Sequence, residues 1–68
     1  MVINMYKRIR DLRESKNYTQ QQLADYLNVS QTTYSRYENG VLDIPSNVLK
    51  KLASFYQVTI DFILEIEI

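Results

Sequence analysis

The hydrophobic positions of this 68-residue chain recur at steps of three and four, as on one face of an α-helix. In the first segment, Met5, Ile9 and Leu12 share a face, and charged residues fall elsewhere. The same periodicity recurs in four later segments and predicts an all-α fold. The expected helices run over about Tyr6 to Lys16, from Thr19 to Leu27, from Gln31 to Asn39, from Ser46 to Tyr56, and over a short segment after Thr59 with Ile60, Ile63 and Leu64 facing inward.

Residues that begin or end helices stand between these segments. Asn17, Asn28 and Gly40 are of the types that best tolerate the left-handed backbone conformation at a helix end. Gln22 follows Thr19 by three residues, which is the spacing of a capping box. The expected N-caps are Thr19, Ser30 and Thr59.

Composition excludes most enzyme classes. The chain has no His and no Cys, so imidazole acid–base chemistry, thiolate nucleophiles and Cys or His zinc sites are excluded. No apolar run exceeds three residues, which is far shorter than a membrane span. We therefore expect one domain over residues 1–68, cytoplasmic and without membrane contact, that is not an enzyme and binds no metal or cofactor.

Charge is balanced over the whole chain but unevenly distributed. The net charge is zero and the pI about 6.1. Residues 1–18 carry a net charge of +3, whereas residues 57–68 carry −3. This polarity is typical of a protein that presents one face to an anionic partner.

The junction of the second and third helices has the residues of a tight corner. Ala24 is small enough for a close approach of two helix backbones, and Asn28 suits the turn. Val29, Tyr34 and Tyr37 supply the apolar side chains that close it.

The outer face of the third helix is polar and nearly uncharged, as suits contact with base edges. Gln can bond adenine through two hydrogen bonds, Arg can bond guanine likewise, and the Thr methyl can pack on thymine. A solvated polar surface would have the same composition. The residues of this face are Gln31, Thr32, Thr33, Ser35, Arg36 and Asn39.

The stretch from Tyr18 to Gly40 resembles the phage-repressor-like helix-turn-helix family of the Cro and Xre type. It has the family's Thr-Gln pair, then Leu-Ala, then Val-Ser, and Glu-x-Gly at the end of the third helix. The resemblance extends over about residues 6–64, with residues 65–68 as a tail. It implies a compact five-helix DNA-binding domain of a transcriptional regulator, most simply a repressor.

The resemblance also implies roles for single residues. Gln31, Thr32 and Arg36 match base-reading positions, and Gln20 matches a phosphate contact at the head of the second helix. Arg13 and Glu38 match a structural ion pair between the first and third helices. Contacts at the edge of the surface or with the DNA backbone are expected from Thr33, Ser35, Asn39, Lys7, Arg8 and Arg10, although the three basic residues fit a solvated surface equally well.

Assembly is expected to involve the C-terminal end of the chain. Phe62 matches an aromatic residue near the family's dimer contact, and Ile66 and Ile68 are apolar residues in a domain short of core. The alternation of Glu65 to Ile68 fits either a frayed tail or a strand paired with a second copy. We expect a homodimer on a palindromic double-stranded operator.

The chain departs from the family pattern at several positions, among them Asn28 in place of the usual turn glycine. Tyr34 and Tyr37 replace the more usual aliphatic residues, and the loop over residues 41–44 lacks the basic residues that some members place against DNA. An alternative function stays open, mainly because of the weak charge of this loop and the near-neutral pI: a protein-interaction module on the same fold, such as an antitoxin-like or anti-repressor subunit.

Overall fold

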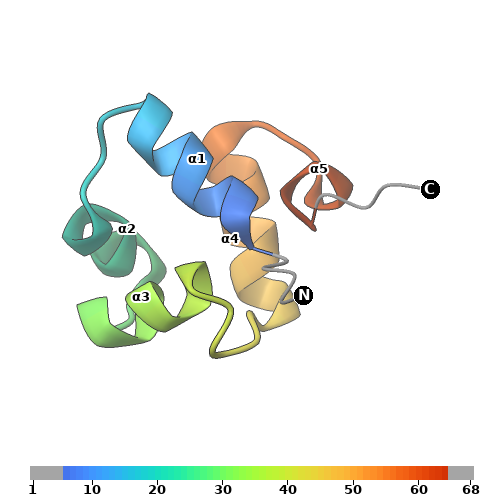
Figure 1. Cartoon of the computed structure of the whole chain (residues 1–68). Helices are drawn as coiled ribbons and strands as arrows, with labels where there is room; N and C mark the ends of the chain where they lie inside the picture. The colour runs from blue at the N-terminus through green and yellow to red at the C-terminus, as the bar shows by residue number, and fades with distance from the viewer. Residues whose placement is uncertain (1–5, 65–68) are drawn as a thin grey trace.

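A computed structural model of the chain describes residues 6–64. Within this range the regular secondary structure is entirely helical, which confirms the predicted all-α fold (Figure 1). The expected first and third helices extend slightly too far, to Lys16 and Asn39, which are the residues that cap them. The helices are α1 (Lys7–Ser15), α2 (Gln20–Leu27), α3 (Gln31–Glu38), α4 (Ser46–Tyr56) and α5 (Ile60–Leu64).

Three helices begin at the predicted N-caps. The Thr19 hydroxyl accepts from the Gln22 amide at 3.1 Å, and the Thr19 amide donates to the Gln22 side chain at 2.8 Å. This reciprocal pair is the predicted capping box. The hydroxyls of Ser30 and Thr59 each accept from the amide three residues later, at 3.1 and 3.0 Å.

Left-handed residues separate the helices. Asn17, Asn28 and Gly40 have φ values of 62°, 60° and 73°, as their residue types predict. Gln57, which ends α4, also has φ 55°. This positive φ was not predicted, because Gln is not among the residue types that favour this conformation.

Every helix contributes a buried side chain to the core. Ile9, Leu23, Tyr34, Leu52 and Ile63, one from each of α1 to α5, have no exposed surface. The helices α2 and α3 pack on each other at one end of the molecule, with α5 at the other end and α1 and α4 between them (Figure 1). The predicted apolar position Met5 lies outside the described residues.

An aromatic cluster connects the α1–α2 turn, α2 and α4. The ring centroid of Phe55 lies 5.2 Å from that of Tyr18 and 4.6 Å from that of Tyr26. Tyr18 and Tyr26 remain partly exposed. The periodicity of a single helix does not show this cluster, since its members come from three segments.

Candidate nucleic-acid interface

The outer face of α3 presents the side chains that the resemblance assigns to base reading. Gln31, Thr32 and Arg36 are exposed, whereas Tyr34 and Tyr37 on the opposite face are buried. The two tyrosines therefore fix the inner side of α3 to the core. The polar side is left facing solvent.

A groove runs between this face and the beginning of α2. Its volume is about 470 Å³. The groove contains the three expected base readers. It also contains Ser35, expected at the edge of the surface, and Gln20, expected at a phosphate. The lining residues are Gln20, Gln31, Thr32, Ser35 and Arg36.

The first turn of α2 borders the groove with backbone donors. The capping box satisfies the amides of Thr19 and Gln22. No acceptor within residues 6–64 takes the amides of Gln20 and Gln21, which lie in the first turn where amides lack intrahelical partners. Such a helix N-terminus is suited to an anion such as phosphate.

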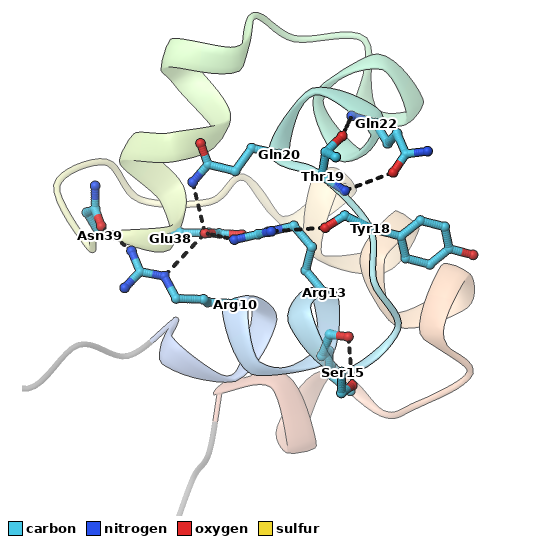
Figure 2. A network of polar contacts seen from close by, with 10 residues as sticks. Arg10, Arg13, Ser15, Tyr18, Thr19, Gln20, Gln22, Glu38 and Asn39 are labelled. Carbon is cyan, nitrogen blue, oxygen red and sulfur yellow. Dashed lines mark hydrogen bonds and ion pairs between the residues drawn. The ribbon is translucent and has the colours of Figure 1, made fainter.

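Glu38 at the end of α3 is the centre of a polar network that includes the groove residue Gln20 (Figure 2). Arg13 donates to both carboxylate oxygens, from Nε to Oε2 at 2.6 Å and from Nη2 to Oε1 at 3.2 Å. Gln20 Nε2 donates to Oε1 at 3.1 Å, and Arg10 Nε lies 3.4 Å from the same oxygen. Arg13 also donates to the Tyr18 carbonyl at 3.0 Å. The network thus joins α1, α2 and α3.

Glu38 is fully buried and remains a carboxylate because of these donors. Burial alone raises the pKa of Glu38, but the donors around the carboxylate, Arg13 foremost, outweigh burial and hold the pKa below its usual value. The same hydrogen bond with Glu38 raises the pKa of Arg13, against the opposing effect of its own burial. Removing either partner would leave a poorly compensated buried charge.

Two buried hydroxyls lie close to this network. Those of Tyr34 and Tyr56 form no hydrogen bond of ordinary geometry with any residue in the range 6–64. Burial raises the pKa of both hydroxyls, and Glu38 raises it further, as a nearby acceptor for Tyr34 and through its negative charge for Tyr56. Both tyrosines are therefore neutral in the folded domain at any ordinary pH.

The basic residues expected at the DNA backbone all have partners inside the domain. Lys7 Nζ lies 3.5 Å from Asp11 Oδ2, and the Arg8 guanidinium carbon lies 4.4 Å from the centre of the Phe62 ring. Lys7 is largely exposed, and its pair with Asp11 has the i,i+4 spacing that sequence could have shown. No sequence signal pointed to the stacking of Arg8.

Arg10 differs from Lys7 and Arg8 because it reaches across to α3. Besides approaching Glu38, its Nη2 donates to Oδ1 of Asn39, the residue that caps α3 (Figure 2). Two residues expected to contact DNA are therefore bonded to each other. The two residues are 29 positions apart, so the sequence alone does not predict this contact.

The loop after α3 presents apolar rather than basic side chains. Val41 is 74% exposed and Leu42 is 40% exposed. The amides of both residues donate to the Arg36 carbonyl, at 3.0 and 3.3 Å, so the loop folds back onto the end of α3.

Residues 6–64 contain no cluster of acidic side chains arranged to hold a metal ion. None of the helices in that range has the length and hydropathy that crossing a bilayer requires.

Comparison with known proteins identifies the family. A profile described as helix-turn-helix, of the Cro type, matches residues 9–63, which include all of α2 and α3. The chain belongs to the helix-turn-helix family. The predicted resemblance is thereby confirmed, and the turn of the helix-turn-helix motif is the corner at Asn28.

Several curated helix-turn-helix proteins are similar to the chain. It is 36% identical over 59 residues to the SPbeta prophage-derived uncharacterized HTH-type transcriptional regulator YonR of Bacillus subtilis, covering 87% of this chain and 55% of YonR. It is 41% identical over 58 residues to the HTH-type transcriptional activator BcrR of Enterococcus faecalis, covering 85% of this chain and 28% of BcrR. It is 38% identical over 53 residues to the cryptic phage CTXphi transcriptional repressor RstR of Vibrio cholerae, covering 78% of this chain and 48% of RstR.

The match is limited to part of each relative. The helix-turn-helix chain spans about half the length of YonR and RstR and less of BcrR. No solved structure gives a significant match.

Proposed function

We propose that the chain is a sequence-specific, double-stranded DNA-binding transcriptional regulator that acts as a repressor and reads the major groove with α3. One observation carries the proposal. Gln31, Thr32 and Arg36 project from one solvent-facing side of α3, and the donor-rich beginning of α2 lies across the groove. Base-reading and phosphate-binding groups thus face one duplex together.

Each base-reading side chain suits a particular base edge. Arg36 would donate two hydrogen bonds to guanine, and Gln31 would donate to and accept from adenine. The Thr32 methyl would pack against a thymine methyl. Thr33 and Ser35, beside the base readers, would contact the flanking backbone, whereas Asn39 at the end of α3 is bonded to Arg10.

Phosphate contacts would position the domain. The free amides of α2 and the second hydrogen of the Gln20 carboxamide are donors that one phosphate could accept from. Lys7 and Arg8 would contribute from α1 by exchanging their present partners for phosphates. Such exchange retains the favourable release of counterions from DNA.

Assembly as a homodimer on a palindrome follows from the size of the reading surface. One α3 helix covers only a few base pairs, whereas two related by a two-fold axis can occupy successive major grooves. Phe62 on α5 is 41% exposed and is the described residue that we place in this contact. The other two, Ile66 and Ile68, lie outside the described residues.

The relatives named as regulators favour DNA binding over the protein-interaction alternative. A DNA-binding regulator of this kind would act in the cytoplasm and needs no cofactor.

The test is a gel shift with the DNA upstream of the gene for this protein, with and without random competitor duplex. The parent should shift this DNA in the presence of competitor. Arg36→Ala should lose about 1–3 kcal/mol of specific binding and relax the preference at one base pair. Lys50→Ala, which removes the same charge from the exposed side of α4, is the matched control and should bind as the parent does. Equal binding of upstream and random DNA by the parent would contradict the proposal.

A further inference from the structure

Arg10 occupies an unusual position between α1 and the last turn of α3. Its guanidinium contacts two consecutive residues, Glu38 through Nε and Asn39 through Nη2 (Figure 2). Its side chain is 41% exposed, whereas that of Arg13 is 13% exposed. Arg10 therefore holds the end of α3 from the solvent side of the network.

Charge balance at Glu38 does not require Arg10. Arg13 already forms two hydrogen bonds with the carboxylate, and Gln20 adds a third. With Arg10 included, two positive charges face one negative charge. A second, half-exposed ion pair adds little to stability, so stability alone does not account for this side chain.

The contact with Asn39 gives Arg10 a different role. Asn39 caps α3, and its amide donates to the Ser35 carbonyl at 3.0 Å. The rigid fork of the guanidinium fixes this cap relative to α1. A positive charge is also favourable at this end of the helix. Only Arg offers two donors in the fixed geometry that can reach both acceptors.

The position of the α3 end matters because Arg36 lies within its last turn. A bidentate contact with a base requires placement of the side chain to within about 0.5 Å. We propose that Arg10 is a positioning residue for sequence discrimination, acting through Asn39 and Glu38 rather than by contacting a DNA phosphate. This inference rests on the proposed DNA-binding function.

The two roles of Arg10 predict opposite results in a salt series. Loss of a phosphate contact weakens binding to every sequence alike and lowers the salt slope by about one unit. Loss of a positioning contact lowers the ratio of specific to non-specific affinity and leaves the slope unchanged. Lys at this position separates the roles further, because it can contact a phosphate but cannot span two acceptors.

In the experiment, the parent protein first selects a duplex from a random-sequence pool. Fluorescence anisotropy then measures the affinity of each variant for the selected duplex and for a scrambled duplex, and the affinity ratio compares the two. Arg10→Gln and Arg10→Lys should both lower the affinity ratio about 3- to 10-fold, as expected for the net contribution of one typical hydrogen bond, with the parent salt slope. Asn39→Ala should lower the ratio similarly, and the double variant Arg10→Gln, Asn39→Ala should lose no more than either single variant. Lys7→Gln is the control for a phosphate contact and should lower the slope while keeping the ratio.

Circular dichroism melting checks that each variant is folded at the assay temperature. We expect the Arg10 variants to be folded, because the Arg10 side chain is partly exposed. An unchanged ratio in Arg10→Gln, or full rescue of the ratio and slope by Arg10→Lys, would overturn the positioning role while the parent still discriminates. Additive losses in the double variant would also overturn it, since they would assign Asn39 a separate contact. A parent that selects no sequence would overturn the proposed function, and this inference with it.

Discussion

At the scale of single residues, Glu38 decides how α3 is held against α1 and α2. It is a fully buried carboxylate with donors from two helices. The sequence suggested its pair with Arg13 only through the family resemblance. Gln20 and Arg10 were expected at DNA instead, because sequence does not show which side chains 18 and 28 residues away converge on one oxygen.

Arg13→Ala tests this network by its effect on stability. The change leaves Glu38 buried with its main partner lost, which can cost about 3–5 kcal/mol for a buried pair. Because Gln20 and Arg10 keep contacts with the carboxylate, we expect a loss of about 2–3 kcal/mol. Urea unfolding measures it, with Arg36→Ala as an exposed arginine control expected within about 0.5 kcal/mol of the parent. A parent-like midpoint for Arg13→Ala would show that the pair contributes nothing to folding.

Glu38 should also give the domain a specific sensitivity to acid. Its pKa is lower in the folded chain than the ordinary 4.5, so the stability it supplies is present above about pH 4.5. That stability is lost as the pH falls through the lowered value. Glu38→Gln has no charge to lose in this range. The variant should be less stable than the parent at pH 7, and the difference between their free energies of unfolding should shrink as the pH falls below 4.5. Urea midpoints from neutral to acid pH measure the gap, and a constant gap would contradict the assignment.

At the scale of helices, local rules predicted nearly all the starts and stops. Thr19, Ser30 and Thr59 cap as expected, because capping depends on residues three positions apart. Asn28 takes the left-handed conformation at the helix-turn-helix corner. Gln57 was missed because Gln is not a residue type that favours a positive φ, yet it takes one in the turn that closes α4, where the Val58 amide donates to the Ala53 carbonyl at 3.0 Å.

The contrast between Gln57 and Asn28 yields a prediction. Gln57→Gly should stabilise the domain by about 0.5–1 kcal/mol, because glycine removes the steric cost of a positive φ and only part of that gain is lost to unfolded-chain entropy. Asn28→Gly should change stability by less, since Asn tolerates this conformation. Thermal melting of the two variants beside the parent tests the order. Equal effects would mean that the residue type at these ends is unimportant.

At the scale of the whole molecule, sequence predicted the set of helices but not their contacts. The basic N-terminal segment is less open to DNA than its net charge of +3 indicated, since Arg10 and Arg13 are engaged with Glu38. Arg8 stacks on Phe62 and so connects α1 with the expected dimer surface on α5. Such contacts depend on the packing of helices far apart in the chain.

Phe62→Ala tests the assembly. It should weaken self-association and binding to a full palindrome while binding to an isolated half-site changes little, because the α3 surface is intact and the Arg8 guanidinium keeps its charge without the Phe62 ring. Analytical ultracentrifugation over a concentration series, with and without the palindromic duplex, measures both effects. Val41→Ala trims another exposed apolar residue as a control. A parent that is monomeric throughout and binds half-site and palindrome equally would exclude the dimer.

The two buried tyrosine hydroxyls have a consequence at the alkaline limit. A raised pKa in the folded state means that the stabilising effect of Tyr34 and Tyr56 is complete below pH 10 and is lost as the pH rises above it. Neither ring can ionise until the chain opens. The chain contains no Trp and six Tyr, so tyrosinate absorbance is an intrinsic optical reporter of that opening. In an alkaline titration, the late rise in absorbance should therefore coincide with the loss of helical circular dichroism.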